Sequence, residues 1–151
     1  MAFDKVKTIL NQLTHEHKIL LRKSEELEKE LEQNFSTETI DKVLKFIEED
    51  VGEHARVEEE DLDKAIEEAG ITEFDIEALN FGHRTLDEIA EHIKYVASLY
   101  KKGKKEYMGK DIKTELIKSV KLFFSTLKDH FTEEEHFFFP DILKYDLERF
   151  E

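Results

Sequence analysis

Six side chains in this sequence have the types and spacing of metal ligands. They interrupt stretches that are otherwise apolar at helical intervals, and they are His17, His54, Glu58, His83, His130 and Glu134. Two of the histidines have a glutamate four positions later, and residues at that spacing share one face of a helix. Imidazole and carboxylate ligands without a thiolate suit iron, manganese or zinc. We therefore expect these residues to form a metal site.

Taken singly, such residues have ordinary explanations. A histidine on an apolar face is more often a core residue with a hydrogen-bond partner, and an inward glutamate more often reaches water from the edge of the core. These explanations do not hold for the six residues together, because buried carboxylates among imidazoles would cost several kcal/mol for each unpaired charge. A bound cation offsets that cost.

The number of ligands indicates two ions rather than one. Six protein ligands are too many for one tetrahedral zinc ion and too few to saturate two octahedral ions. If both glutamates bridge, the protein fills roughly eight of about twelve coordination positions, and the others are open to solvent or to a small molecule. Open positions are typical of a reactive centre rather than of a structural one.

Four long helices would have to position these side chains. Gly and Pro are scarce, with 5 and 1 residues, and most of them fall between stretches in which apolar residues recur every three or four positions. The stretches run from the N-terminus to near Asn34, from Ser36 or Thr37 to Gly70, from Thr72 to Lys101, and from Ile112 to Pro140. The fourth apolar stripe consists of Ile112, Leu116, Val120, Phe123, Leu127, His130, Glu134 and Phe137.

Local signals mark the boundaries of the second helix. Ser36 or Thr37 can cap its N-terminus. Gly70 followed by Ile71 is typical of a helix C-terminus with an apolar contact.

The other boundaries have signals of their own. Thr72 and Asp75 have the spacing of a capping box, which would open the third helix. Residues 101–109 form a basic, glycine-containing connection, and Pro140 is expected to break the fourth helix and leave a short tail.

The candidate ligands are expected at one level. In an antiparallel pair of helices, two residues are level when the midpoint of their numbers falls in the turn between them. The midpoints of three pairs, His17 with His54, Glu58 with His83, and His83 with His130, fall in predicted connections. We therefore predict an all-α fold, an up-down-up-down four-helix bundle with a short C-terminal extension, with the ligands in one interior layer.

The composition narrows the function classes. With 151 residues, the chain has the size of one domain, and we expect a single domain over residues 1–151. The formal net charge of −14 argues against a nucleic acid or an anionic membrane as partner, because both require a basic face. The absence of cysteine excludes disulfides and thiolate chemistry. Since there is no long apolar run and no signal-peptide pattern, the expected location is the cytoplasm.

The combined pattern resembles the hemerythrin-like, or HHE cation-binding, family. It consists of His17, His54-x-x-x-Glu58, His83 and His130-x-x-x-Glu134, and the segment from His130 to Glu135 with Phe139-Pro140 is similar to that family's fourth-helix signature. The resemblance covers nearly the whole chain. It implies a left-handed bundle with a non-haem di-iron centre, in which two iron ions, rather than manganese or zinc, are bridged by two carboxylates and an oxo or hydroxo group.

Two positions depart from the oxygen-carrying members of that family. The carriers have a second histidine four residues after the third-helix histidine, where this chain has Asp87. They also have an aspartate five residues after the fourth-helix histidine, whereas this chain has Glu134 at four and Glu135 at five. The chain resembles a four-histidine branch, so reversible oxygen transport is not expected. Asp87 is either a further ligand or neighbour of the metal, or a solvated helix position.

The remaining histidines are expected at the surface. His15 and His92 are out of phase with the ligand stripes, and Glu133-x-x-His136, a ferritin-like pattern, has no second copy. Several phenylalanines are expected either to wall the metal site or to pack in the core, and they are Phe46, Phe81, Phe123, Phe124 and Phe131.

These observations favour one function and leave two alternatives. The leading hypothesis is a soluble di-iron protein that binds or reduces a small oxidant, namely oxygen, peroxide or nitric oxide. One alternative is an iron or oxygen sensor, in which the metal state orders the bundle for a protein partner. The other is iron storage or delivery. Turnover of peroxide or nitric oxide would indicate an enzyme, whereas stoichiometric oxidation with a large change in stability would indicate a sensor.

Overall fold

The described part of the chain folds into four helical rods and a short hairpin. The structure, a computed structural model, describes residues 2–72, 74 and 76–148. The first rod is α1 (Ala2–Gln33) and the third is α5 (Ile76–Lys101). The second rod consists of α2 (Thr37–Lys45), η1 (Phe46–Val51), α3 (Gly52–Arg56), η2 (Val57–Leu62) and α4 (Asp63–Glu68), where η denotes a π-helical turn. The fourth consists of α6 (Ile112–Glu133), η3 (Glu134–Phe138) and α7 (Phe139–Glu148). These residues are mostly helical, so the predicted all-α class is confirmed.

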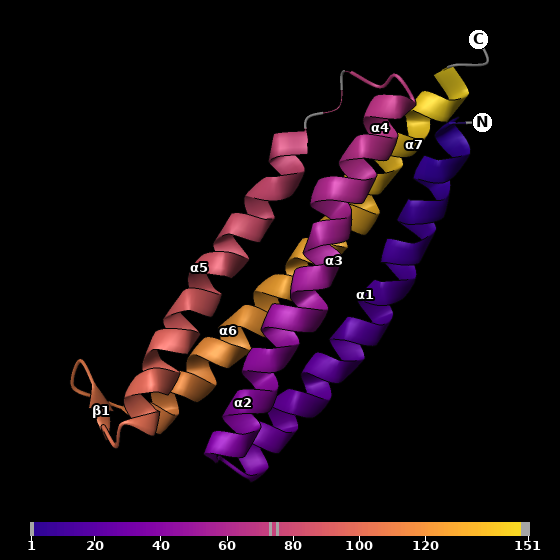
Figure 1. Cartoon of the computed structure of the whole chain (residues 1–151). Coiled ribbons are helices and arrows are strands. Elements are labelled where there is room, and N and C mark those ends of the chain that lie inside the picture. The colour runs from indigo at the N-terminus through magenta and orange to yellow at the C-terminus, as the bar shows by residue number, and fades with distance from the viewer. Residues whose placement is uncertain (1, 73, 75, 149–151) are drawn as a thin grey trace.

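The four rods lie side by side (Figure 1). α6 packs against both α1 and α5, and α1 also contacts α2 and α4. The α1–α2 turn and the hairpin after α5 lie at one end of the molecule, whereas α4 leads to α5 at the end where α1 begins and α7 ends. The middle of each rod can therefore face a common interior.

The predicted cap of the second rod is confirmed at Ser36. The Ser36 hydroxyl accepts a hydrogen bond of 3.2 Å from the Thr39 backbone N–H, and the Thr39 hydroxyl accepts one of 3.0 Å from the Ser36 backbone N–H. This reciprocal capping box satisfies two backbone donors that would otherwise have no partner.

The predicted C-terminus of the second rod is confirmed at Gly70. Gly70 has a φ of 75°, in the left-handed region that favours glycine. The Ile71 N–H donates to the carbonyl of Ile66, as in a Schellman motif, and both isoleucine side chains are buried. The capping box predicted at Thr72 and Asp75 depends on Asp75, which lies outside the described residues.

The connection between the third and fourth rods is a β-hairpin, which the sequence analysis did not predict. β1 (Glu106–Tyr107) pairs antiparallel with β2 (Lys110–Asp111). The two loop residues, Met108 and Gly109, have φ values of 49° and 80°. Positive φ at both positions is the requirement of a type I′ turn, whose twist matches that of the strands. The Asp111 side chain then caps α6.

The π-helical turns also differ from the predicted regular helices. η1 and η2 flank α3, and η3 separates α6 from α7. A π turn adds one residue to a helical turn, so it moves the side chains that follow to a new face. Phe137 is for this reason 68% exposed, whereas Phe139 is buried, and the prediction that Phe137 is buried was wrong.

The predicted break at Pro140 is also wrong. The helix continues through Pro140 as α7, a helix of 10 residues, so the C-terminal extension is not a short tail. Pro140 is the second residue of α7, directly after η3. In η3 the hydrogen bonds reach back five residues, as from the Phe139 N–H to the Glu134 carbonyl, and this wider turn accommodates a residue without an N–H at its end.

The apolar interior consists of two clusters. One lies toward the α1–α2 turn and includes Leu31 and Phe123, and the other lies toward the opposite end and includes Leu13, Leu62 and Ile142. The candidate ligands belong to neither cluster. Burial of both clusters holds the four rods together and leaves a polar layer between them.

No helix in the described residues is both long and apolar enough to cross a membrane. The cytoplasmic location and the single-domain organisation stay predictions.

Candidate metal centre

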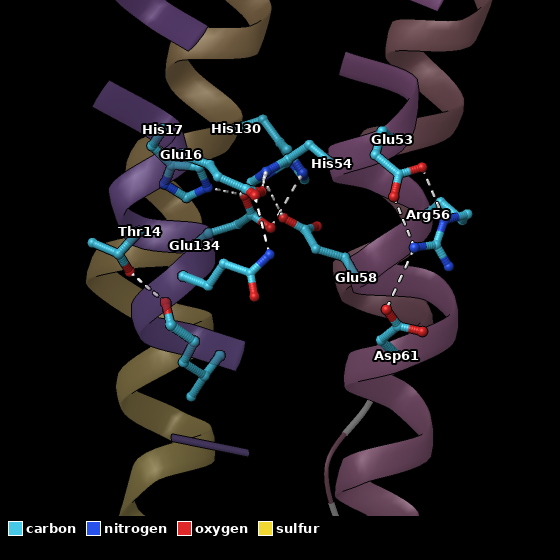
Figure 2. Close-up of polar contacts among 12 residues, drawn as sticks. Thr14, Glu16, His17, Glu53, His54, Arg56, Glu58, Asp61, His130 and Glu134 are labelled. Carbon is cyan, nitrogen blue, oxygen red and sulfur yellow. Dashed lines mark hydrogen bonds and ion pairs between the residues drawn. The ribbon is translucent and has the colours of Figure 1, made fainter. Parts of the chain in front are cut away.

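The structure brings the six candidate ligands together. They are His17 on α1, His54 on α3, Glu58 in η2, His83 on α5, His130 on α6 and Glu134 in η3. All of them are buried, and the two carboxylates are 0% exposed. Figure 2 shows both carboxylates and the imidazoles of three rods pointing toward one another. Each rod therefore contributes to one interior layer, as the sequence predicted.

The six residues form two groups of four that share both glutamates. One group is His17, His54, Glu58 and Glu134, and the other is Glu58, His83, His130 and Glu134. Within each group, one ligand atom from each residue lies within 4.8 Å of all the others. Two shared carboxylates are what a pair of carboxylate-bridged ions requires.

The distances between neighbouring ligand atoms suit metal coordination. His83 Nε2 lies 2.8 Å from Glu58 Oε2, and His54 Nε2 lies 2.9 Å from Glu58 Oε1. His17 Nε2 lies 3.1 Å from Glu134 Oε1. Two atoms that bind one ion at about 2.1 Å and at right angles are about 3.0 Å apart. The three separations are close to that value.

Several inward atoms have no hydrogen-bond partner among the described residues. In this centre they are Nε2 of His17, His54 and His130, Oε1 of Glu58 and both carboxylate oxygens of Glu134. A buried polar atom without a partner costs about 1–3 kcal/mol. A pair of cations would satisfy these atoms, since they belong to the two groups of ligands that converge here. The donor set of imidazoles and carboxylates therefore fits a pair of metal ions.

Three other glutamates bond the outer nitrogens of the imidazoles. The Nδ1 atoms of His17, His54 and His83 lie 3.1, 3.2 and 2.9 Å from carboxylate oxygens of Glu135, Glu16 and Glu59, respectively. Glu135, which the departure from the family pattern singled out, belongs to neither group of inward ligands in the described residues.

Aromatic rings hold one of the imidazoles from both sides. The His17 ring stacks on Phe131 with centroids 4.0 Å apart and on Phe139 with centroids 5.8 Å apart. Phe131 therefore walls the centre, which is one of the two roles expected for the phenylalanines. Phe81 neither walls the metal site nor packs in the core, because it is 64% exposed. It lies two positions before His83, which is about 200° around the helix.

Gly82 lets the fourth imidazole approach the backbone of α5. A Cβ atom at Gly82 would lie 2.2 Å from His130 Nδ1, far closer than any real contact. His130 Nε2 lies 3.7 Å from Glu134 Oε2, on the inner side of the same ring. The missing side chain therefore makes the room in which His130 faces the centre.

The two shared carboxylates have opposite pKa shifts. Burial raises the pKa of Glu134 well above its ordinary value, and the negative charge of Glu58 raises it further. Burial alone would raise the pKa of Glu58 too, but its close contacts with Glu134, His54 and His83 hold it well below its ordinary value. The two shifts favour a metal-free centre with an ionised Glu58 and a protonated Glu134.

Burial keeps two of the imidazoles neutral. It lowers the pKa of His17, and it lowers the pKa of His130 to about 4. For His83 burial acts in the same direction, but the bonds to Glu58 and Glu59 outweigh it and raise the pKa. Neutral imidazole is the form that binds metal, so His17 and His130 are already in that form at neutral pH.

A small cavity adjoins the centre between α3 and α5. Its volume is about 50 Å³. Its lining includes His54, His83 and His130 beside the apolar side chains of Leu86, Phe123 and Leu127. This space accommodates a diatomic molecule or a few waters.

Asp87 also lines the cavity, although its side chain is exposed. Partial burial raises its pKa, and so does the charge of Glu59. Among the described residues, Asp87 belongs to neither group of candidate ligands. Its position is therefore beside the cavity and not among the converging atoms.

The other three histidines lie away from the centre. His15 and His136 are exposed, as predicted. His92 is 34% exposed, and its Nε2 lies 3.0 Å from a carboxylate oxygen of Glu115. This pairing ties α5 to α6 near the hairpin.

Comparison of the chain with protein-family models, with curated proteins and with solved structures found no match. The resemblance to the hemerythrin-like family therefore stays a prediction that depends on the residues of the centre themselves.

Sequence reasoning missed four residues around the centre. One is Gly82, which makes room for an imidazole. The others are the glutamates that bond the outer nitrogens, Glu16, Glu59 and Glu135. The sequence analysis considered Glu135 only as a metal ligand. An isolated glycine inside an amphipathic helix is a signal of close packing and could have singled out the first. Each of the three glutamates is a chain neighbour of a candidate ligand, which is a weaker signal.

Proposed function

We propose that this protein is a non-haem di-iron protein of the hemerythrin-like type that binds or reacts with a small oxidant: oxygen, peroxide or nitric oxide. The observation that carries the proposal is the pair of ligand groups that share Glu58 and Glu134. In this proposal the four rods form an up-down-up-down bundle around the centre. Each ion keeps open positions, because the protein offers fewer ligands than two six-coordinate ions need.

Each residue has a distinct role in this proposal. His17 and His54 would hold one iron and His83 and His130 the other, and both ions would share the carboxylates of Glu58 and Glu134. When bound, the iron pair supplies electrons to an oxidant at an open position. Glu134, whose pKa is raised by burial and by the charge of Glu58, releases its proton as metal binds.

The size and lining of the cavity favour a small, uncharged substrate. The cavity of about 50 Å³ reaches three of the histidines and is lined mainly by apolar side chains. Apolar walls exclude excess water and admit a diatomic molecule at little desolvation cost.

One observation favours a sensor as the second candidate function. The ligands come from all four rods, so the metal links every rod to the others. A metal that binds only the folded arrangement stabilises it by an amount that grows with the logarithm of free metal over the dissociation constant. A metal-dependent change in the order of the rods could then be read by a protein partner. Iron storage or delivery has no comparable observation in its favour.

Rapid mixing distinguishes these functions. Protein loaded anaerobically with ferrous iron is mixed with oxygen, hydrogen peroxide or nitric oxide, and optical spectra are recorded. We expect near-ultraviolet absorption from the oxidised iron pair and fast reaction with at least one oxidant. Repeated turnover with an added reductant indicates an enzyme, whereas one oxidation per centre with a large shift in the unfolding temperature indicates a sensor.

Glu58→Gln is the matched control, because it removes one shared carboxylate with little change of size. It should lose both the absorption and the reaction. A fully iron-loaded parent protein that reacts with none of the three oxidants would contradict the proposal.

A further inference from the structure

A second set of carboxylates surrounds the centre, outside the residues that face the metal. Glu16, Glu59 and Glu135 each place a carboxylate oxygen within 2.9–3.2 Å of an imidazole Nδ1. A carboxylate can only accept a hydrogen bond when ionised, so the Nδ1 atom must carry the proton. When such a ring is neutral and binds a metal, Nε2 is therefore the atom whose lone pair faces the ion.

The three contacts link different rods. Glu16 directly precedes His17 in the chain, but it bonds His54 on the second rod. Glu135 of the fourth rod bonds His17 on the first rod. In the same way, Glu59 of the second rod bonds the histidine of α5, His83. Each outer carboxylate is thus a chain neighbour of one candidate ligand and orients another on the next rod.

These carboxylates differ from the other acidic residues of the surface. The side chains of Glu16, Glu59 and Glu135 are 29%, 45% and 35% exposed, whereas their imidazole partners are at most 6% exposed. Several other surface carboxylates pair with Lys or Arg, for example Glu53 with Arg56. In the ion pairs of the described residues, the three outer carboxylates have histidine partners only. They reach water on one side and a buried imidazole on the other.

We propose that Glu16, Glu59 and Glu135 are positioning residues that set the tautomer and the basicity of three metal-binding imidazoles. The inference rests on the proposed metal centre. An acceptor on Nδ1–H fixes the ring orientation and increases electron donation from Nε2 to a metal. The outer carboxylates therefore strengthen metal binding and lower the reduction potential of the iron pair without touching the metal.

Glu59 gives the sharpest test, because its contact is the shortest and its exposed position tolerates substitution. Glu59→Ala removes both the acceptor and the charge, while Glu59→Gln keeps an amide oxygen as acceptor and removes only the charge. Glu60→Ala is the matched control: Glu60 is the next residue, is exposed, and pairs with Arg56 on the surface.

Three measurements are made on each variant above neutral pH. The first is the affinity for ferrous iron, measured anaerobically by competition with a chelator. The second is the reduction potential of the iron-loaded protein. The third is the tautomer of His83 in the metal-free protein, from the chemical shifts of ¹⁵N-labelled imidazole, which does not depend on iron. Thermal unfolding of the metal-free variants verifies that each one folds.

We expect Glu59→Ala to bind iron about 10- to 100-fold more weakly than Glu60→Ala. Its reduction potential should be more positive. The population of the Nδ1–H tautomer of His83 should fall below that of the parent, because Glu58 then remains as the acceptor at Nε2. Glu59→Gln should restore the tautomer and part of the affinity. A purely structural role for Glu59 would instead change thermal stability while leaving potential and tautomer unchanged.

Two outcomes would overturn the inference, and they are distinguishable. If the parent binds two iron ions but Glu59→Ala matches Glu60→Ala in affinity, potential and tautomer, the positioning role is wrong and the centre stands. If the parent itself binds no iron, the proposed function fails, and the positioning role fails with it.

Discussion

Replacement of Gly82 by alanine should weaken metal binding, although Gly82 is not itself a candidate ligand. Gly82 is in the interior of α5, where alanine normally stabilises a helix by about 0.5–1 kcal/mol relative to glycine. Here the added Cβ would lie 2.2 Å from His130 Nδ1. The substitution should therefore have the opposite of its usual effect.

The size of the effect follows from the displacement that the new Cβ requires. An ordinary Cβ contact begins at 3.4 Å, so a ring now at 2.2 Å must move away. The displacement is about 1.2 Å, whereas metal–ligand distances tolerate only about ±0.2 Å. The ring of His83, with its centroid 4.9 Å from that of His130, restricts where the imidazole can go. We expect one ion of the pair to bind at least about 100-fold more weakly, which is about 2.7 kcal/mol.

The assay is an anaerobic titration with ferrous iron, followed by metal analysis after removal of weakly bound iron. Gly82→Ala should keep roughly one ion, held by the undisturbed group of His17 and His54, in place of the two expected for the parent. Gly52→Ala is the control, because a Cβ there would meet only Ile47 O at 3.7 Å, an ordinary contact. It should keep the parent's iron content.

A Gly82→Ala protein with the parent's iron affinity and stoichiometry would refute this reasoning. It would mean that His130 does not need its present position to bind metal. Thermal unfolding of the metal-free variants completes the comparison, since Gly52→Ala should be slightly more stable than the parent and Gly82→Ala should not.

Three further predictions concern the electrostatics of the centre and the neighbouring cavity. Burial and the charge of Glu58 raise the pKa of Glu134 and so favour its protonated form, which a glutamine resembles. Glu134→Gln should therefore change metal-free stability by less than about 1 kcal/mol and still lose iron, whereas Glu58→Gln should destabilise clearly more in chemical unfolding. The pKa of His130 is lowered from 6.5 to about 4, so its stabilising contribution is present above pH 6.5 and is lost as the pH falls to 4. Relative to His130→Asn, the metal-free parent should lose about 3 kcal/mol over that range, and equal pH profiles would contradict the shift. Oxygen should oxidise the reduced parent irreversibly, whereas Asp87→His should make oxygen uptake more reversible in optical titrations.

The helical pattern was predictable because the apolar period persists along each rod. Burial of Leu10, Leu13, Leu27 and Leu31 follows directly from steps of three and four residues. The convergence of the ligands was predictable for a related reason. Rods that run in opposite directions from short connections place residues at equal distances from a turn at one level.

The π turns could not be predicted from the same periodicity. A single extra residue in a turn has no compositional signature. The ligand pairs do not reveal it either, because two residues four apart, such as His54 and Glu58, remain close on one side of the helix. The change becomes visible only downstream, at Phe137 and Phe139, where the phase has moved. A proline directly after such a turn, Pro140, then has the sequence appearance of a helix end.

The roles of the outer carboxylates could not be predicted because the chain is so acidic. Among 37 Asp and Glu residues, Glu16 and Glu59 look like solvated surface positions. Only the geometry across two rods distinguishes them from neighbours such as Glu60, which pairs with Arg56. The close approach at Gly82 likewise depends on a residue of another rod, His130.

The dinuclear centre is tested most directly by metal analysis of protein loaded anaerobically with ferrous iron and then freed of weakly bound metal. Two ligand groups that share both glutamates predict about two iron ions per chain, with loss of both in Glu58→Gln. A content of one zinc ion per chain, unaffected by the iron supply, would contradict the di-iron assignment.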